Sequence, residues 1–376
     1  MKLPVYLDYN ATTPVDPAVL EALLPYLSDH FGNPHSSHAY GATAATAVAG
    51  ARAQVAGLLG ALPEEIVFTS CASESNNLAI KGAAFALREK GRHIITTAVE
   101  HPAVLNTCRY LEREFGFELT VLPVDSLGQV DPEWVREAIR PDTILISVIH
   151  AQNETGVLQP VSEIGWIARE QGILFHVDAA QAVGKIPVDV GDLNCDLLTV
   201  AGHKLYAPKG VGALYIRSGV ELHPLIHGAA YEGGRRAGTD NVALAVALGK
   251  ACALAAEHIA AGEPTRLQAL RDRLHELLAD QLPVRLNGHK EDRLPGTLNI
   301  SVIEAVGNDL LAAVPEIAAS TGSACHAGVS RPSEVLLAMG IKPVIALGAL
   351  RLSVGRYTTQ EEVEYAAERI IRAATR

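Results

Sequence analysis

The stretch Val200–Lys209, VAGHKLYAPK, places Lys204 just beyond an apolar run of the chain. The residues that lead into it, CDLLTV (195–200), are typical of a buried strand. A lysine amine in a desolvated pocket has a lowered pKa and becomes a nucleophile that traps carbonyl groups. We therefore expect Lys204 to be the covalent anchor of a cofactor that carries a carbonyl group.

A second apolar run, ILFHVD (173–178), ends in the acid Asp178, which lies 26 residues before Lys204. Pyridoxal 5'-phosphate carries an aldehyde and a pyridine nitrogen, and a carboxylate that faces this nitrogen keeps the ring an electron sink. Taken singly, a lysine after a strand is usually a surface residue, and an acid often simply ends a strand. Together, Lys204 and Asp178 indicate pyridoxal 5'-phosphate as the cofactor.

Apolar runs alternate with helix-like segments along the chain, which predicts an α/β fold with both faces of the sheet covered. Ligands of open α/β sheets bind beyond the carboxyl ends of the strands, and the residues that follow these runs are polar. Long alanine-rich helices are expected at about 239–281, before a second α/β segment. The expected strands are 64–70, 93–100, 118–125, 143–151, 173–178, 195–200, 211–217, 297–303 and 350–355.

The composition restricts the class of protein. With 376 residues, of which 48% are hydrophobic, the chain can form one large core and a smaller one. The net charge of −11 argues against a nucleic-acid surface. We find no apolar run of about 18 residues and no signal peptide, so we expect no membrane contact and a cytoplasmic protein.

Five cysteines are scattered along the chain, and none forms a C-x-x-C motif. This pattern indicates neither a disulfide framework nor a metal site. We expect four of them to pack as small apolar residues. These are Cys71, Cys108, Cys195 and Cys252.

Longer motifs resemble a known family: LDYNATTP (7–14), EHPAVL (100–105), QNETG (152–156), HVDAAQAVGK (176–185), GHKLYAPKGVGALYI (202–216), GSACHAG (322–328) and RLSVGRYTT (351–359). In this order they resemble the cysteine desulfurase and selenocysteine lyase family, pyridoxal-phosphate enzymes of the class V aminotransferase group. The resemblance covers nearly the whole chain. It implies the fold type I of aspartate aminotransferase, with a large, mostly parallel sheet domain and a smaller α/β domain.

The same resemblance predicts the division into domains. We expect residues 13–260 to form the large cofactor-binding domain. Residues 1–12 and 261–376 are expected to form the small domain, which would carry the catalytic cysteine loop and the substrate arginine.

The resemblance implies three contacts to phosphate. Ser73 falls between a predicted strand and a helix expected to begin near Ser75, and helix N-termini bind anions through free N–H groups. The alternative for these serines is ordinary helix capping. In the family, Ser73 and His203 lie in the phosphate pocket, while Thr239 reaches the phosphate of the partner subunit, which implies a homodimer.

Three further residues would contact the ring or the substrate. The resemblance implies that His101 stacks on the pyridine ring and relays protons, and an aromatic face there fixes the plane of the ring. A lone histidine after a strand is otherwise more often a capping or core residue. Asn153 would hold the carboxylate side of the substrate, and Gln181 the phenolic oxygen of the cofactor, although each is also a common turn residue.

Cys325 lies in a loop of small residues, 320–328, where a thiol remains accessible. The resemblance identifies it as the nucleophile that takes sulfur from the substrate. Arg351 alternates with apolar residues, so it should point away from the core face of its strand. A guanidinium suits an α-carboxylate, and we expect Arg351 to bind substrate, with Arg356 left to form a salt bridge.

The chain departs from the family pattern at three places. Cys71-Ala72 replaces the usual glycine-rich pair before Ser73, and Ala201 replaces a serine found in many relatives. In the segment 228–239, GAAYEGGRRAGT, the residues Ala229-Ala230-Tyr231 replace Gly, Gly and Gln or His. The last change leaves the local backbone path and the substrate preference open.

We therefore expect a pyridoxal-phosphate-dependent cysteine desulfurase. It would convert L-cysteine to L-alanine, with the sulfur held as a persulfide on Cys325 and passed to a thiol or an acceptor protein. A selenocysteine lyase acting on L-selenocysteine is the alternative enzyme, favoured by Ala201. A cofactor-holding scaffold without turnover is the alternative of another class, suggested by the altered segment 228–231.

Overall fold

A computed structural model describes residues 3–321 and 331–375. Within these ranges the larger sheet has the strand order β2-β8-β7-β6-β5-β3-β4, and β8 alone runs antiparallel to its neighbours. Every residue of β5 is buried, as expected for a parallel strand covered on both faces. The strands are β2 (Ile66–Thr69), β3 (His93–Thr97), β4 (Glu118–Leu122), β5 (Thr143–Ile149), β6 (Leu174–Asp178), β7 (Leu197–Ala201) and β8 (Gly212–Ile216).

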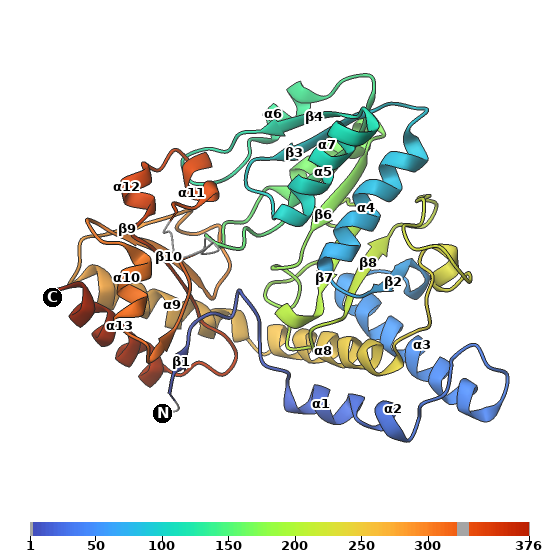
Figure 1. Cartoon of the computed structure of the whole chain (residues 1–376), viewed down its shortest axis with the longest axis horizontal. Helices are drawn as coiled ribbons and strands as arrows, with labels where there is room; N and C mark the ends of the chain where they lie inside the picture. Colours follow the sequence, from blue (N-terminus) through green and yellow to red (C-terminus); the bar gives the residue numbers. More distant parts are fainter. Residues whose placement is uncertain (1–2, 322–330, 376) are drawn as a thin grey trace.

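Helices cover both faces of this sheet (Figure 1). Helices α4 (Ala72–Leu87) and α5 (Pro102–Phe115) bury apolar side chains against one face. The larger core on the other face takes apolar residues from several helices. These are α1 (Pro17–Leu23), α3 (Ala39–Leu59), α6 (Pro132–Ala138), α7 (Val161–Gln171) and α8 (Val242–Ala260), with the short α2 (Pro25–Ser28) following α1.

A second lobe, on the left in Figure 1, has its own hydrophobic cluster. In the described ranges it holds an antiparallel sheet of order β12-β10-β9 and a parallel pair β1-β11. Its strands are β1 (Val5–Tyr6), β9 (Val284–Leu286), β10 (Thr297–Val302), β11 (Ile317–Ala318) and β12 (Ala349–Ser353). Its helices are α9 (Glu263–Ala279), α10 (Gly307–Ala312), α11 (Glu334–Ala338), α12 (Pro343–Ala346) and α13 (Gln360–Ala374).

Helix α8 lies along the lower edge of the large lobe and leads into α9 (Figure 1). By length and composition alone it could cross a membrane, and it is the one such helix in the described part of the chain. Half of its apolar window is nevertheless buried inside the protein, where Leu248 and Ala251 join the large core. Its apolar character is thus explained by packing.

The two lobes meet where α8 gives way to α9. Gly262 takes the left-handed conformation with φ 86° at this change of direction. Arg356 forms ion pairs with Asp16 at 2.9 Å and with Glu263 at 3.1 Å, and its guanidinium lies 4.1 Å from the ring centre of Tyr206. The expected salt bridge of Arg356 is present, but its side chain is only 7% exposed and ties the lobes together.

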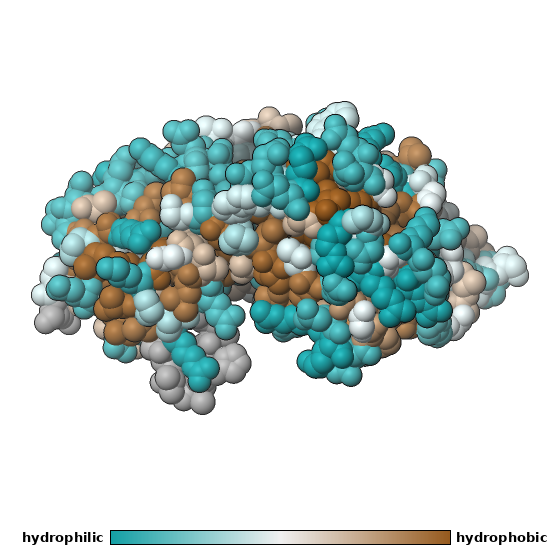
Figure 2. All heavy atoms as spheres, turned by 90° about the horizontal axis from the view of Figure 1, so that it is seen from above, coloured by the Kyte–Doolittle hydropathy of each residue, from teal (hydrophilic) through white to brown (hydrophobic). Residues whose placement is uncertain are grey.

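Val5 and Leu7 pack in the cluster of the second lobe, together with residues of α9. This supports the proposed assignment of the first dozen residues to the small domain, and the boundary near residue 260 stays a prediction. Figure 2 shows that polar side chains dominate much of the face seen from above, with apolar ones gathered along its middle and over both lobes.

Every strand expected from the sequence is present, usually with shorter bounds. The expected helices at 239–281 are α8 and α9. The short strands β1, β9 and β11 were not predicted.

Candidate active site

Lys204 lies at the end of a short 3-10 helix, Gly202–Lys204, directly after β7. Its Nζ donates hydrogen bonds to the backbone carbonyl of Asn10 and, at 3.0 Å, to that of Ala11. Burial and the nearby Arg351 lower the pKa of Lys204 to about 8, against the opposing effect of two carboxylates. A sizeable fraction of the amine is therefore neutral near physiological pH, as nucleophilic attack requires.

Asp178 ends β6, the strand beside β7, and is 2% exposed. Its Oδ2 accepts a hydrogen bond of 2.7 Å from the Asn76 side chain, and its Oδ1 accepts one of 3.0 Å from the Ala180 N–H. Asp178 pairs with Thr199 of β7, so Asp178 and Lys204 leave the sheet at the same edge. The strand pattern thus brings together the two residues on which the cofactor prediction depended.

Asn10 is the centre of the hydrogen-bond network around Lys204, and it is 3% exposed. Its backbone carbonyl accepts from Lys204 and, at 2.9 Å, from Gln181 Nε2. Its side-chain Nδ2 donates to Thr297 Oγ1 at 2.9 Å and to the Asn153 carbonyl at 3.2 Å. Residues of both lobes therefore meet at this one side chain.

Arg351 reaches the same site from β12. It lies between Leu350 and Leu352, which point into the core of the second lobe, so its guanidinium faces away from that core as expected. Its Nη2 donates to Asp8 Oδ1 at 2.8 Å and its Nη1 to the Asn153 carbonyl at 3.2 Å. The buried Nε has no partner in the described protein, so the guanidinium retains donor capacity for an anion.

Two histidines border the site. His101 follows β3 and caps α5, where its Nδ1 accepts a hydrogen bond of 3.1 Å from the Ala103 N–H. His101 is partly exposed, and burial of the rest of the ring lowers its pKa; the Asp178 charge opposes this shift and the Lys204 charge adds to it. His203 lies 3.2 Å from Thr12 Oγ1, and burial with the nearby Lys204 lowers its pKa to about 4. Both rings are therefore neutral at pH 7.

The N-terminus of α4 has no side-chain cap. The helix begins at Ala72 and not near Ser75 as the sequence suggested, with Cys71 in the N-cap position. Neither serine caps it, since Ser75 bonds to Thr69 Oγ1 at 2.7 Å and the Ser73 side chain is exposed. The first-turn N–H groups thus stay available for an anion, as expected for a phosphate site.

Ion pairs hold the segment 228–239 against α4 and against α3. Arg236 contacts Glu74 at 2.9 Å on the first turn of α4. Glu232, 3% exposed, accepts two hydrogen bonds from Arg52 at 2.7 and 2.8 Å. Thr239 is exposed and lines a cavity of about 240 Å³ that also contains Ser70 and Arg236.

The replacement of a family residue by Tyr231 has a local explanation. The Tyr231 ring stacks on His35 with ring centres 4.1 Å apart, and His35 Nε2 lies 2.9 Å from Asp240 Oδ2. Gly233 and Gly234 follow with φ of 64° and 80°, a conformation that favours glycine. The backbone path left open by the sequence is thus fixed by an aromatic contact and two left-handed glycines.

Cys325, the expected nucleophile, lies outside the described residues. Of the four other cysteines, Cys108, Cys195 and Cys252 are buried as expected. Burial raises the pKa of the Cys252 thiol to about 12. Cys71 departs from the expectation, because it is half-exposed at the start of α4.

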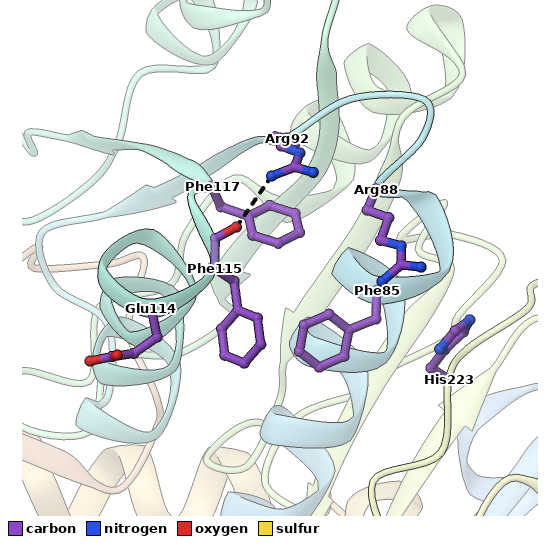
Figure 3. Close-up of a pocket in the computed structure, with 7 residues that line it drawn as sticks. All are labelled: Phe85, Arg88, Arg92, Glu114, Phe115, Phe117 and His223. Carbon is purple, nitrogen blue, oxygen red and sulfur yellow. Dashed lines mark hydrogen bonds between the residues drawn. The ribbon is translucent and has the colours of Figure 1, made fainter.

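Another cavity lies away from this site. It has a volume of about 560 Å³ and lies at the far ends of α4 and α5, where the Phe85 and Phe115 rings meet edge to face (Figure 3). Arg92 donates to the Phe115 carbonyl at 3.4 Å beside it. A smaller cavity of about 20 Å³ is the one that Lys204 and Asn10 line.

The arrangement fits pyridoxal 5'-phosphate. A buried carboxylate and a half-buried amine of lowered pKa follow the neighbouring strands β6 and β7, and the uncapped N-terminus of α4 follows β2. The ends of parallel strands are where α/β folds bind such ligands. Asn76 Oδ1 is buried without a partner beside Asp178 in the described protein. Fold and site together define a pyridoxal-phosphate enzyme of fold type I.

Comparison with known proteins identifies the family. The model of the aminotransferase class-V family matches residues 5–366. A cysteine desulfurase IscS of Anaeromyxobacter dehalogenans is 50% identical over 370 residues, covering 97% of this chain and 91% of the relative. The chain belongs to the class V aminotransferase family, in the branch that contains the cysteine desulfurases, and members of this family depend on pyridoxal phosphate.

Solved structures support the same family assignment. A NifS-like protein superposes with a TM-score of 0.92 at 39% identity, covering 98% of each chain. A protein named SspA, solved in complex with cysteine, superposes with a TM-score of 0.82 at 41% identity, covering 94% of this chain and 99% of that one. These relatives favour the desulfurase over the selenocysteine lyase that the sequence left open.

Several site residues carried no prediction. Asn10 and Asp8 stand in the LDYNATTP motif, but a polar residue after a two-residue strand carries no periodic signal. Asn76, in the second turn of α4, gave no separate signal in the sequence. Lys185, which closes the HVDAAQAVGK motif, bonds to both Asn10 and Gln181 and was likewise missed.

Proposed function

We propose that this chain is a cysteine desulfurase that converts L-cysteine to L-alanine and receives the sulfur on Cys325. The observation that carries the proposal is the juxtaposition of Lys204, Asp178 and Arg351 in one site, in a chain half identical to proteins named cysteine desulfurase. A related protein was solved with cysteine bound, which supports the same substrate here.

The cofactor, when bound, supplies an electron sink that accepts the electrons released at the substrate carbons. Lys204 is proposed to hold it through the amine and, once displaced by substrate, to move the α-proton. Asp178, fixed by Asn76, would keep the ring nitrogen protonated. The first turn of α4 with Ser73, together with His203, would hold the phosphate.

Arg351 is proposed to bind the substrate carboxylate. Its unpartnered Nε and its position between Asp8 and the Asn153 carbonyl give it fixed geometry and spare donor capacity. Asn153 would border the carboxylate, and Gln181 would donate to the phenolic oxygen of the cofactor. His101 would cover the ring and, being neutral at pH 7, could accept a proton.

The sulfur step balances without an external oxidant. The Cys325 thiolate attacks the substrate sulfur, the carbon–sulfur bond breaks, and the carbon keeps the electron pair and takes a proton. The products are alanine and a persulfide on Cys325. A thiol or an acceptor protein then removes the outer sulfur.

Thr239 is proposed to contact the phosphate of the cofactor held by a second copy of the chain, in a homodimer.

The experiment compares wild type, Cys325→Ala and Cys71→Ala with cysteine and with selenocysteine. Alanine and protein-bound persulfide are measured. We expect Cys325→Ala to lose alanine formation from cysteine and the persulfide, while Cys71→Ala, a control at the half-exposed cysteine of the described chain, keeps both. An unchanged rate of alanine formation in Cys325→Ala would refute the mechanism.

A further inference from the structure

A second lysine, Lys185, lies inside the same network and has no assigned role. Its Nζ is 2.5 Å from Gln181 Oε1 and 3.0 Å from Asn10 Oδ1. Burial lowers its pKa well below the usual value, and the charges of Lys204 and Arg351 lower it further. Buried lysines are rare without a carboxylate partner, and its hydrogen-bond partners in the described ranges are both amide oxygens.

The chemistry of lysine decides how these two amides are oriented. An amide side chain has one accepting and one donating end, and Lys185 Nζ donates both of these hydrogen bonds. Both amides therefore turn their oxygens toward Lys185. The amide nitrogens of Asn10 and Gln181 then point away from Lys185. The oxygen and nitrogen ends of an amide are alike in shape, so the contact with Lys185 is what distinguishes them.

The contacts on the other side agree with this orientation. Gln181 Nε2 donates to the Asn10 carbonyl at 2.9 Å, the same carbonyl that accepts from Lys204. Asn10 Nδ2 donates to Thr297 Oγ1 and to the Asn153 carbonyl. The Lys185 amine thus sets the direction of the Asn10 and Gln181 side-chain donors beside the anchoring lysine.

We propose that Lys185 is a positioning residue that holds Gln181 with its amide nitrogen facing the anchoring site, so that Gln181 acts as a donor to the phenolic oxygen of the cofactor. The proposal rests on the proposed function, from which the role of Gln181 comes. Without Lys185, the Gln181 amide is free to turn. If its oxygen faced the anionic phenolic oxygen of the cofactor, the two oxygens would repel each other.

A donor to the phenolic oxygen favours its deprotonated, anionic state. Loss of this donor should raise the pH midpoint at which the bound cofactor changes its visible absorbance. The charged groups around this network are Lys204 and Arg351, which act on Lys185, and Asp8 and Asp178, which act on Lys204.

The test is an absorbance titration of cofactor-loaded protein, which needs no substrate. For Lys185→Met we expect the midpoint to rise by about one pH unit and the dissociation constant of pyridoxal phosphate for the apoprotein to rise roughly tenfold. Lys185→Arg keeps the donors and should restore the wild-type midpoint. Lys81→Met is the matched control, since Lys81 is a half-buried lysine that lies 4.5 Å from the Tyr110 ring.

Gln181→Glu removes the donor directly and should raise the midpoint as well. In the double variant with Lys185→Met, the two shifts should not add, because both act through one contact. Additive shifts would overturn the proposal, since Lys185 would then act by another route. An unchanged midpoint in Lys185→Met would also overturn it.

Lys185→Gln is the second variant if the methionine variant does not fold. Its shorter polar side chain supplies an oxygen as well as a donor, so the amides are no longer forced into one orientation, and an unchanged midpoint overturns the proposal here too. Failure of the proposed function is seen separately. Suppose that the wild type binds pyridoxal phosphate but forms no alanine from cysteine, while the variants show the predicted midpoint shifts. This result would refute the desulfurase function but not the role of Lys185.

Discussion

The lowered pKa of Lys204 predicts how fast the apoprotein takes up its cofactor at each pH. An amine reacts with an aldehyde only in its neutral form. With a pKa of about 8, Lys204 is neutral in about 9% of molecules at pH 7, compared with about 0.03% for an ordinary lysine. The reactive fraction is thus larger by a factor of about 300, and the rate should level off above pH 8.

Substitutions at the charged neighbours of Lys204 should move the pH midpoint of the uptake rate, which reports the pKa of Lys204, in opposite directions. Arg351 lowers the pKa of Lys204 and Asp8 raises it. Arg351→Met should therefore shift the midpoint up, and Asp8→Asn should shift it down, each by about one unit. The size of each shift also reports how far the guanidinium and carboxylate neutralise each other across their 2.8 Å contact.

The assay is stopped-flow absorbance after mixing apoprotein with pyridoxal phosphate between pH 6 and pH 10. The reaction of the same cofactor with a blocked free lysine, measured at each pH, corrects for titration of the cofactor itself. Lys204→Ala with borohydride trapping confirms that the signal reports residue 204. A rate that continues to rise toward pH 10.5, as for free lysine, would refute the reasoning from burial.

Three other predictions concern substrate, stability and assembly. Arg351→Lys loses the forked guanidinium, so the KM for cysteine in steady-state alanine formation should rise roughly tenfold to a hundredfold, and an unchanged KM would remove Arg351 from the substrate site. Arg52→Met leaves the Glu232 carboxylate, which is 3% exposed, without its guanidinium partner, and should lower the free energy of unfolding by about 3–5 kcal/mol. Glu232→Gln leaves the charge on the more exposed arginine, so urea unfolding should show a smaller loss; equal losses would contradict this. Thr239→Ala should remain a dimer in light scattering with cofactor affinity reduced about fivefold, whereas a stable, cofactor-loaded monomer of wild type would contradict the shared site.

Apolar runs were sufficient for the sheet because most of its strands are buried on both faces, with β4 as the exception. A strand such as β5, with seven consecutive buried residues, leaves a mainly apolar run in the sequence, interrupted by Ser147. Strands β1 and β11 have two residues each, too few for any pattern, and were missed for that reason. The start of α4 was placed late because the expected serine cap is absent, and Cys71 in the N-cap position gives no capping signal.

The site was predictable where a residue's chemistry is rare and its position follows a strand. Lys204 and Asp178 meet both conditions. Asn10 and Lys185 do not, because an asparagine in a turn and a lysine at the end of a motif are common in any chain. Their importance comes from contacts between residues 175 positions apart, and no local pattern encodes such a contact.

The Asn10 network also constrains the order in which the protein can mature. The Asn10 N–H bonds to Ser353 Oγ at 3.0 Å, across a separation of 343 residues, and Thr297 completes the same cluster. A ribosome must therefore synthesise the chain through the end of β12 before the hydrogen-bond network beside Lys204 can form. Contacts of such separation form late in folding because the intervening chain must first be ordered. Cofactor capture is thus an event of the finished chain, and nascent fragments that already contain Lys204 and Asp178 should bind pyridoxal phosphate weakly.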